Sequence, residues 1–137
     1  MMALVDSGFL YATLDSSDKN HARTTHVLAN LADELLLPTV VLVETTYLLH
    51  ARLGHDAMRQ FIQRLGQTPL PLISLLQTDL PRVYEVLEQY ANLRLDFVDA
   101  ANVAVAERLN IQRILTVDQR DFRVIRPKHC AYFEILP

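Results

Sequence analysis

Short apolar runs alternate along this chain with longer segments whose apolar residues recur at helical spacing. Two of the short runs, Ala3–Val5 and Ile114–Val117, are followed at once by an aspartate, Asp6 and Asp118 respectively. A continuous apolar run of this length, bounded by a polar residue, is typical of a strand that is buried on both faces. We therefore predict two central strands that each end at a carboxylate.

The rest of the pattern predicts the alternating order of an α/β protein. We expect further strands at Leu35–Pro38, Pro69–Ser74 and Tyr132–Leu136, and helices at Gly8–Leu14, His21–Asp33, Val40–Leu53, His55–Gly66, Leu76–Tyr90 and Phe97–Leu109. Thr39 is the expected N-cap of the third helix, and Gly54 its C-terminal stop. Strands that alternate with helices form a mainly parallel sheet between helical layers. The pattern favours one α/β domain over residues 1–137, with ligands bound beyond the carboxyl ends of its strands.

The composition fits one compact domain with a substantial core. Half of the 137 residues are hydrophobic and 21% are charged, and the chain has only three glycines and six prolines, too few for a flexible linker. The apolar start has no basic leader, and no apolar run reaches the length of a membrane span. We therefore expect a cytoplasmic protein with no membrane partner. Cys130 is the single cysteine, which excludes an internal disulfide and a cysteine-rich zinc site.

Four carboxylates lie beside apolar segments, where an ionised acid is costly: Asp6, Glu44, Asp99 and Asp118. A buried ionised carboxylate is unfavourable unless it is paired, hydrogen-bonded or bound to a metal. Acids that are brought together also raise one another's pKa, and a divalent cation reverses that effect. Because the available ligands are all oxygens, the set suits Mg²⁺ or Mn²⁺ and not zinc.

Each acid also has a purely structural interpretation, which the sequence leaves open. Asp6 fits the N-cap of the helix that follows it, and Glu44 fits the exposed face of its helix. Asp96 and Asp99 stand three residues apart, as a helix N-cap and its first turn do. Asp118 fits the first position of a turn. The occurrence of all these acids in one chain favours a shared site over separate structural roles.

The acids occur in motifs that resemble those of PIN-domain nucleases, most closely the VapC-like toxins of bacterial and archaeal toxin–antitoxin pairs. The resemblance runs nearly end to end and rests on four segments: Val5-Asp6-Ser7, Val43-Glu44, Leu95–Ala101 and Leu115–Phe122. It implies a PIN-like α/β/α sandwich and an endoribonuclease supported by Mg²⁺ or Mn²⁺. It also implies a homodimer and inhibition by a cognate antitoxin. The apolar helices around Val40–Leu53 or Leu28 would form a groove for an amphipathic antitoxin segment, or would pack only against their own sheet or a second subunit.

The resemblance assigns catalytic roles to four residues: Asp6, Glu44, Asp99 and Asp118. Asp6 and Asp99 would hold the principal metal, while Glu44 and Asp118 would complete the pocket, orient a water or hold a second ion. Ser7 and Thr116 would steady carboxylates or bind phosphate, and Asp96 would be a supporting acid or only a helix cap. Such a pocket would hydrolyse RNA phosphodiester bonds by in-line displacement.

The net charge of −3 argues against an RNA partner until its distribution is considered. Setting aside the five acids of the expected site leaves 11 acidic residues against 13 basic ones, a balance of +2. Eleven of the basic residues are arginine, the side chain best shaped for phosphate. The basic stretch Arg108–Lys128 predicts RNA contacts from Arg120, Arg123 and Arg126, although a solvated basic face would explain it equally well.

Other chemistries fit the residues less well. The five histidines show no spacing that pairs them as acid and base or as zinc ligands, and Cys130 has no visible partner. An aspartyl-phosphate phosphatase or a receiver-like module needs a lysine near the acids, and only Lys19 and Lys128 are present. The alternatives are a PIN-like RNA- or partner-binding module without cleavage activity and an RNA-processing nuclease outside a toxin–antitoxin system.

Overall fold

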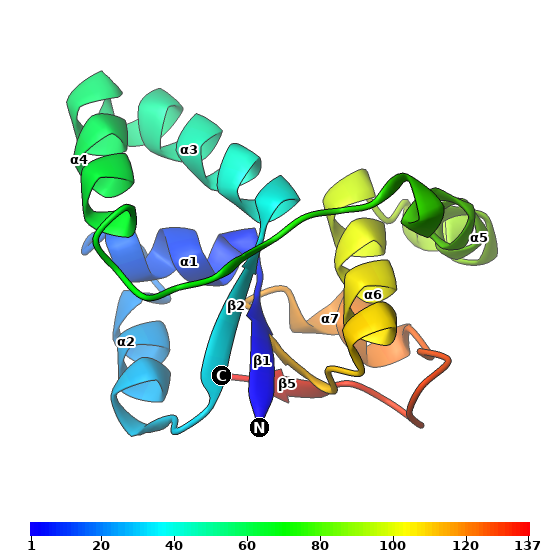
Figure 1. The fold of residues 1–137 in the computed structure, drawn as a ribbon. Coiled ribbons are helices and arrows are strands. Elements are labelled where there is room, and N and C mark those ends of the chain that lie inside the picture. The colour runs from blue at the N-terminus through cyan, green and yellow to red at the C-terminus, as the bar shows by residue number, and fades with distance from the viewer.

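The computed structural model describes residues 1–137 and has a five-stranded sheet between two groups of helices (Figure 1). The strands are β1 (Met2–Val5), β2 (Glu34–Pro38), β3 (Leu72–Ile73), β4 (Arg113–Leu115) and β5 (Glu134–Leu136). Their spatial order is β3-β2-β1-β4-β5, and every neighbouring pair is parallel. The expected α/β sandwich with a mainly parallel sheet is confirmed.

The helices divide into two groups on either side of the strands (Figure 1). The first group holds α1 (Ser7–Leu14), α2 (His21–Asn30), α3 (Thr39–Leu53) and α4 (His55–Leu65), and the second holds α5 (Leu80–Gln89), α6 (Phe97–Leu109) and α7 (Gln119–Val124). Short 3₁₀ turns at Gln77–Asp79 and Ala91–Leu93 flank α5. None of these helices combines the length and the apolar character that a bilayer crossing would require.

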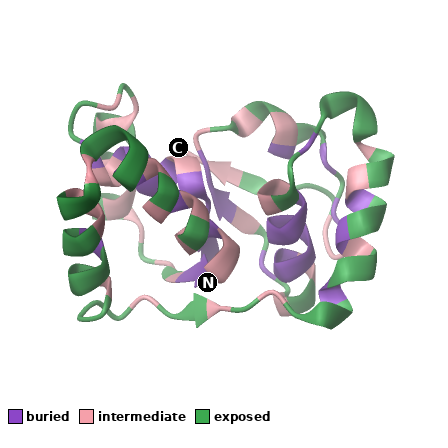
Figure 2. Ribbon diagram, turned by 90° about the horizontal axis from the view of Figure 1, so that it is seen from above, coloured by how far each residue is buried: buried purple, intermediate pink, exposed green.

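Successive residues of the central strands alternate between two hydrophobic cores. In β1, Ala3 and Val5 pack in the core shared with α1 and α3, whereas Leu4 packs in the core shared with α5 and α6. In β4, Ile114 and Leu115 divide between the two cores in the same way. Both faces of the strands are therefore buried, which is why these strands are continuously apolar. Figure 2 shows this burial concentrated in the interior, between largely exposed outer helix faces.

The strand order changes direction at β1, which is the place where sheets of this kind commonly bind ligands. Strand β1 pairs with β2 on one side and with β4 on the other. At such a switch point the connections after the two strands lead to opposite sides of the sheet and leave a gap at their carboxyl ends. Asp6 lies at this edge, and its N–H donates to the Leu115 carbonyl at 2.9 Å.

Several expected element boundaries were wrong, and proline explains two of them. The segment Leu76–Tyr90 is a 3₁₀ turn followed by α5, because Pro81 fits the first turn of a helix and not its interior. The strand expected at Pro69–Ser74 shrinks to β3, since a proline cannot donate to a strand ladder. Helix α2 ends at Asn30 and not at Asp33.

The remaining differences lie at the ends of elements. Helix α3 begins at Thr39 with Pro38 at its N-cap, so the capping role expected of Thr39 was wrong. Gly54 does end this helix, with a φ of 99° that a residue with a side chain rarely adopts. Strand β4 stops at Leu115, ahead of the expected end at the aspartate, and β5 begins at Glu134. The sequence pattern did not predict α7.

Candidate active site

Asp6 is held in one orientation at the carboxyl end of β1. Its side chain is only 4% exposed, and each carboxylate oxygen has a donor. Asn102 Nδ2 donates to Oδ1 at 3.0 Å, and Thr116 Oγ1 donates to Oδ2 at 2.8 Å. Helix α1 starts at the next residue, but the Asp6 side chain makes no capping hydrogen bond. Asp6 therefore occupies the N-cap position of α1, as the sequence allowed, but its carboxylate oxygens accept from Asn102 and Thr116.

The surroundings of Asp6 disfavour its charged form. Burial raises the pKa of Asp6 to about 6, against the opposing hydrogen bond from Thr116, and the carboxylates of Glu44 and Asp96 raise it further. Desolvation and like charges both act on the ionised carboxylate, and a bound cation would offset both. Asp6 is therefore placed where a positive ligand would stabilise its ionised form.

Glu44 reaches the same site from α3. Its side chain is half-buried and accepts a hydrogen bond from the Ser7 hydroxyl at the start of α1. Glu44 also contributes to the raised pKa of Asp6, so the two carboxylates are close enough to interact. The structure therefore does not place Glu44 on an exposed helix face, and it gives Ser7 the carboxylate contact that its position suggested.

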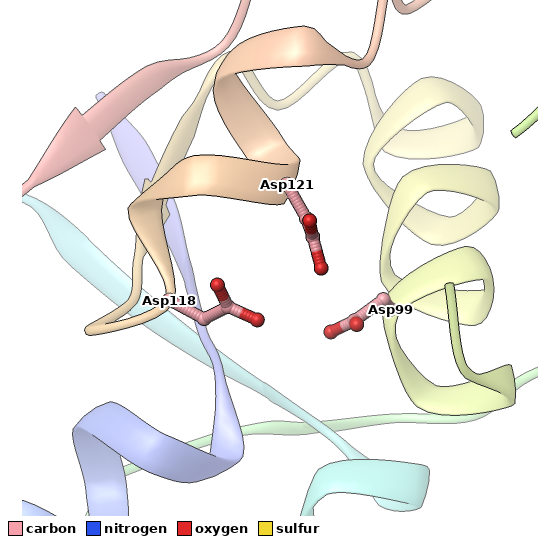
Figure 3. Close-up of side chains that lie close together, drawn as sticks. All are labelled: Asp99, Asp118 and Asp121. Carbon is pink, nitrogen blue, oxygen red and sulfur yellow. The ribbon is translucent and has the colours of Figure 1, made fainter. Parts of the chain in front are cut away.

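Three further aspartates, from the start of α6 and the start of α7, form a cluster. The carboxylate oxygens of Asp99, Asp118 and Asp121 lie within 4.8 Å of one another. Figure 3 shows these side chains, one from the start of α6 and two from the start of α7, pointing toward a common centre. Asp118 is exposed, whereas Asp99 and Asp121 are half-buried. This cluster has the composition and spacing of an oxygen-only cation site.

The pKa shifts connect this cluster to Asp6. Burial is the first cause of the strongly raised pKa of Asp99, and the negative charges of Asp6, Asp96 and Asp118 follow. Burial also raises the pKa of Asp118, and neighbouring Asp121 adds to the effect. Because Asp99 interacts with acids on both sides, the carboxylates belong to one electrostatic unit.

Asp96 has the structural role that its spacing indicated. Its Oδ1 accepts a hydrogen bond from the Asp99 N–H at 2.9 Å, which makes it the N-cap of α6. Its charge also raises the pKa of both Asp6 and Asp99. Asp96 therefore fixes the helix end that carries Asp99 and adds negative charge to the site.

Two residues of the site were not predicted from the sequence. Asp121 joins Asp99 and Asp118 because the start of α7 faces the start of α6 (Figure 3). Asn102 is 1% exposed and donates to Asp6, one helical turn after Asp99. A signal for Asn102 was present, since a polar residue within the run of alanine and valine in this helix must be buried and needs a partner.

The donor set fits a divalent cation such as Mg²⁺ or Mn²⁺. The side chains offer only oxygen atoms, and burial together with the negative charge of the neighbouring acids raises the pKa values of Asp6 and Asp99. The buried Oδ1 of Asn102 also has no hydrogen-bond partner among the protein atoms. An unpartnered buried oxygen beside gathered carboxylates is consistent with a site that takes a hydrated cation.

The arginines expected to bind RNA lie on α7 and just after it. Arg120 and Arg123 are exposed on this helix, close to Asp118. Arg126 is also exposed, but its Nη1 donates to the Arg123 carbonyl at 2.7 Å and closes the end of α7. The structure therefore brings two of the three expected residues to the edge of the acidic site.

Comparisons with known proteins agree with this arrangement. The model of the PIN domain family matches residues 3–126. The chain is 28% identical over 134 residues to ribonuclease VapC26 of Mycobacterium tuberculosis, covering 98% of this chain and 99% of that protein. Its fold is similar to the crystal structure of M. tuberculosis VapC20, described as a sarcin-ricin loop cleaving toxin. That match has a TM-score of 0.81 at 23% identity, over 98% and 99% of the two chains.

A second solved structure is similar over the full length of both chains. It is VapBC2 from Rickettsia felis bound to a DNA fragment from its promoter, with a TM-score of 0.72 and 12% identity. At these identities the two structural matches support the fold alone. The family model, by contrast, spans β1 through α7 and includes every acid of the site. The chain therefore belongs to the PIN-domain family.

Proposed function

We propose that this protein is a divalent-metal-dependent endoribonuclease that hydrolyses RNA phosphodiester bonds and acts as the toxin of a toxin–antitoxin pair. The observation that carries the proposal is the convergence of four sequence-distant acids at the carboxyl edge of the sheet: Asp6, Glu44, Asp99 and Asp118. The relatives named as a ribonuclease and as a toxin support the same assignment.

The acids would bind the metal, and their hydrogen-bond partners would position them. Asp6 and Asp99 would hold Mg²⁺ or Mn²⁺, with Glu44 and Asp118 completing the pocket or orienting a water. The bound cation would lower the pKa of a bound water and neutralise negative charge on the phosphate. Thr116 and Asn102 hold the Asp6 carboxylate, Ser7 holds Glu44, and Asp96 fixes the start of α6.

The RNA would lie along the basic side of the site. Arg120 and Arg123 are exposed beside Asp118 and would contact phosphate groups. Arg126 would add positive charge to the same side, although its guanidinium also donates to backbone carbonyls. Phosphate contacts of this kind position the strand without selecting its sequence.

An antitoxin and a second subunit are the expected protein partners, and the cytoplasm is the expected location. An apolar hollow of about 270 Å³ lies between α1, α3 and α4 and is lined by Leu10, Leu49 and Phe61, among others. Val43 and Tyr47 of α3 are 70% and 71% exposed. These apolar surfaces would suit an amphipathic antitoxin segment and a subunit contact.

Cleavage of a total RNA pool tests the proposal. We expect the purified protein to cut RNA with Mn²⁺ or Mg²⁺ and to lose this activity in EDTA. The Asp6→Asn/Asp99→Asn double variant should be inactive while retaining its fold by circular dichroism. The matched control is Asp56→Asn, which removes an exposed carboxylate of α4 that pairs with Arg59.

Two results would contradict parts of the proposal. Undiminished cleavage by the double variant would show that these acids do not carry the reaction. RNA binding by the wild type without cleavage under any divalent metal would favour the binding module instead. Growth arrest on expression, relieved by the product of a neighbouring gene, would separate a toxin from an RNA-processing nuclease.

A further inference from the structure

Three arginines gather around a shallow hollow that borders the acidic site. The hollow has a volume of about 560 Å³ and is lined by Arg23, Val117, Asp118, Gln119, Arg120 and Arg123. Arg23 comes from α2, whereas Arg120 and Arg123 come from α7. Residues from distant parts of the chain therefore present guanidinium groups to one space.

These guanidinium groups differ from the ion-paired arginines elsewhere in the protein. Arg82, Arg108 and Arg113 each pair with a carboxylate, but none of the three arginines of the hollow does. Arg23 donates to the neutral Asn20 side chain at 3.3 Å, and Arg123 donates to the neutral Gln119 side chain at 2.9 Å. The hollow therefore holds three positive charges against the single carboxylate of Asp118.

Asp118 belongs to both the hollow and the acidic cluster. Its carboxylate lines the hollow, and its oxygens lie within 4.8 Å of those of Asp99 and Asp121. The hollow is thus the next recess along the surface from the cation site. A polynucleotide with one phosphate at the acids would bring a neighbouring phosphate over these arginines.

We propose that Arg23, Arg120 and Arg123 form a subsite for an RNA phosphate adjacent to the one that is cleaved. This inference rests on the proposed ribonuclease function and adds a residue from α2 to the RNA-binding surface. A guanidinium binds a phosphate through two parallel N–H donors. Three guanidinium groups would both position the phosphate and neutralise its charge. An acidic protein segment is the competing ligand. An RNA strand is favoured because Asp118 belongs to both the hollow and the acidic cluster, so a strand bound at the acids would continue into the hollow.

The salt dependence of RNA binding tests the subsite directly. For single-stranded nucleic acid, the slope of log affinity against log salt changes by about 0.7 for each neutralised phosphate. The probe is a fluorescein-labelled, mixed-sequence oligoribonucleotide, measured by anisotropy in the Asp99→Asn background so that it is not cut. The variants Arg23→Ala, Arg120→Ala and Arg123→Ala are compared with Arg59→Ala, which removes the same charge from α4, outside the hollow.

We expect each variant of the subsite to bind the probe several-fold more weakly, and the double variant Arg23→Ala/Arg120→Ala to have a salt slope shallower by about 0.7 or more. Arg59→Ala should match the parent. With the active parent and Mn²⁺, the same changes should raise KM and leave kcat nearly unchanged. Replacement by lysine should restore the salt slope more fully than the affinity, because lysine keeps the charge but not the two-pronged contact.

The inference fails if the subsite variants match Arg59→Ala in both affinity and salt slope while the wild type still cleaves RNA. It also fails if a poly-glutamate peptide binds in an arginine-dependent manner and RNA does not. Loss of RNA binding and cleavage in every form, including the wild type, would instead overturn the proposed function together with this subsite. Melting temperatures equal to that of the parent ensure that each variant is folded.

Discussion

The two sides of the acidic site are built differently. On one side, Asp6 is buried and receives a hydrogen bond on each carboxylate oxygen from Asn102 and Thr116. On the other side, Asp118 is exposed and Asp121 is half-buried, and neither carboxylate receives a comparable side-chain donor. We call these the fixed side and the open side of the site.

From this difference we infer that the fixed side and the open side of the site have different roles. A buried carboxylate with both oxygens held cannot adjust, so it sets the position of whatever it binds. Exposed carboxylates can change rotamer and can reach a ligand directly or through water. Asp99 lies between the two sides and interacts with acids on both. We therefore expect substitutions on the fixed side to be more damaging than those on the open side.

The largest effect should come from Asp6→Asn. This change removes a charge whose position is fixed, while the new amide can still accept from Asn102 and donate to the Thr116 hydroxyl, so the loss falls on the charge. We expect Mn²⁺-dependent cleavage to fall by more than the roughly 10–100-fold that a lost supporting residue costs. Asp118→Asn should cost only about tenfold, within that same range. Initial cleavage rates of one labelled RNA give both values, and a reversed order would contradict the comparison.

The next effect should come from Asn102→Leu, which keeps the shape of the side chain and removes its donor to Asp6. We expect Mn²⁺ affinity to fall about tenfold, with partial recovery of cleavage at high Mn²⁺, because the carboxylate loses its fixed orientation. The matched control is Thr45→Val, since the Thr45 hydroxyl is also buried but has no hydrogen-bond partner. Equal Mn²⁺ affinities for the two variants would rule out a positioning role for Asn102.

The pH dependence of stability tests the burial of Asp6 without any reaction. Its pKa is about 6 in the fold, against an ordinary value of 3.8, so the folded protein binds the extra proton between these values. The stabilisation of the fold by protonated Asp6 is complete below pH 3.8 and is lost as the pH rises through about 6. In EDTA, the urea midpoint of Asp6→Asn should therefore rise relative to that of the wild type as the pH increases. A pH-independent difference would contradict the burial of Asp6.

The smallest effect should come from Asp121→Asn. Its carboxylate lies on the open side of the site beside Asp99 and Asp118, so a water or a neighbouring side chain can replace it. We expect a loss of cleavage of only about threefold and little change in Mn²⁺ affinity, well below the range for a supporting residue. A loss as large as that of Asp6→Asn would move Asp121 into the group of residues that hold the metal.

The sequence predicted the parts of the fold that a local pattern determines. The apolar runs of β1 and β2 and the long helices α3 and α6 occur within about one residue of their expected positions, because both faces of the strands and most of α6 are buried. The short helix α7 was missed, since six residues with mixed polarity carry no clear period. Its position depends on Phe122, which is fully buried in the core shared with α5 and α6.

The same distinction applies to the site. Asp6 and Asp118 were predicted because each follows an apolar run that forms a central strand, and the carboxyl ends of parallel strands meet at one edge of the sheet. Asp121 was missed because its place depends on how α7 turns back toward Asp99, a tertiary feature. Asn102 was missed although its neighbours marked it as buried, because a single sequence does not tell which carboxylate a buried amide will contact.

The central claim is that the separated acids form one pocket that binds a divalent cation, and Mn²⁺ titration followed by calorimetry tests it most directly. We predict saturable Mn²⁺ binding by the wild type at neutral pH, and its loss in the Asp6→Asn/Asp99→Asn double variant, which removes the two carboxylates assigned to the metal. Binding of Mn²⁺ by the folded double variant with the affinity of the wild type would contradict the claim.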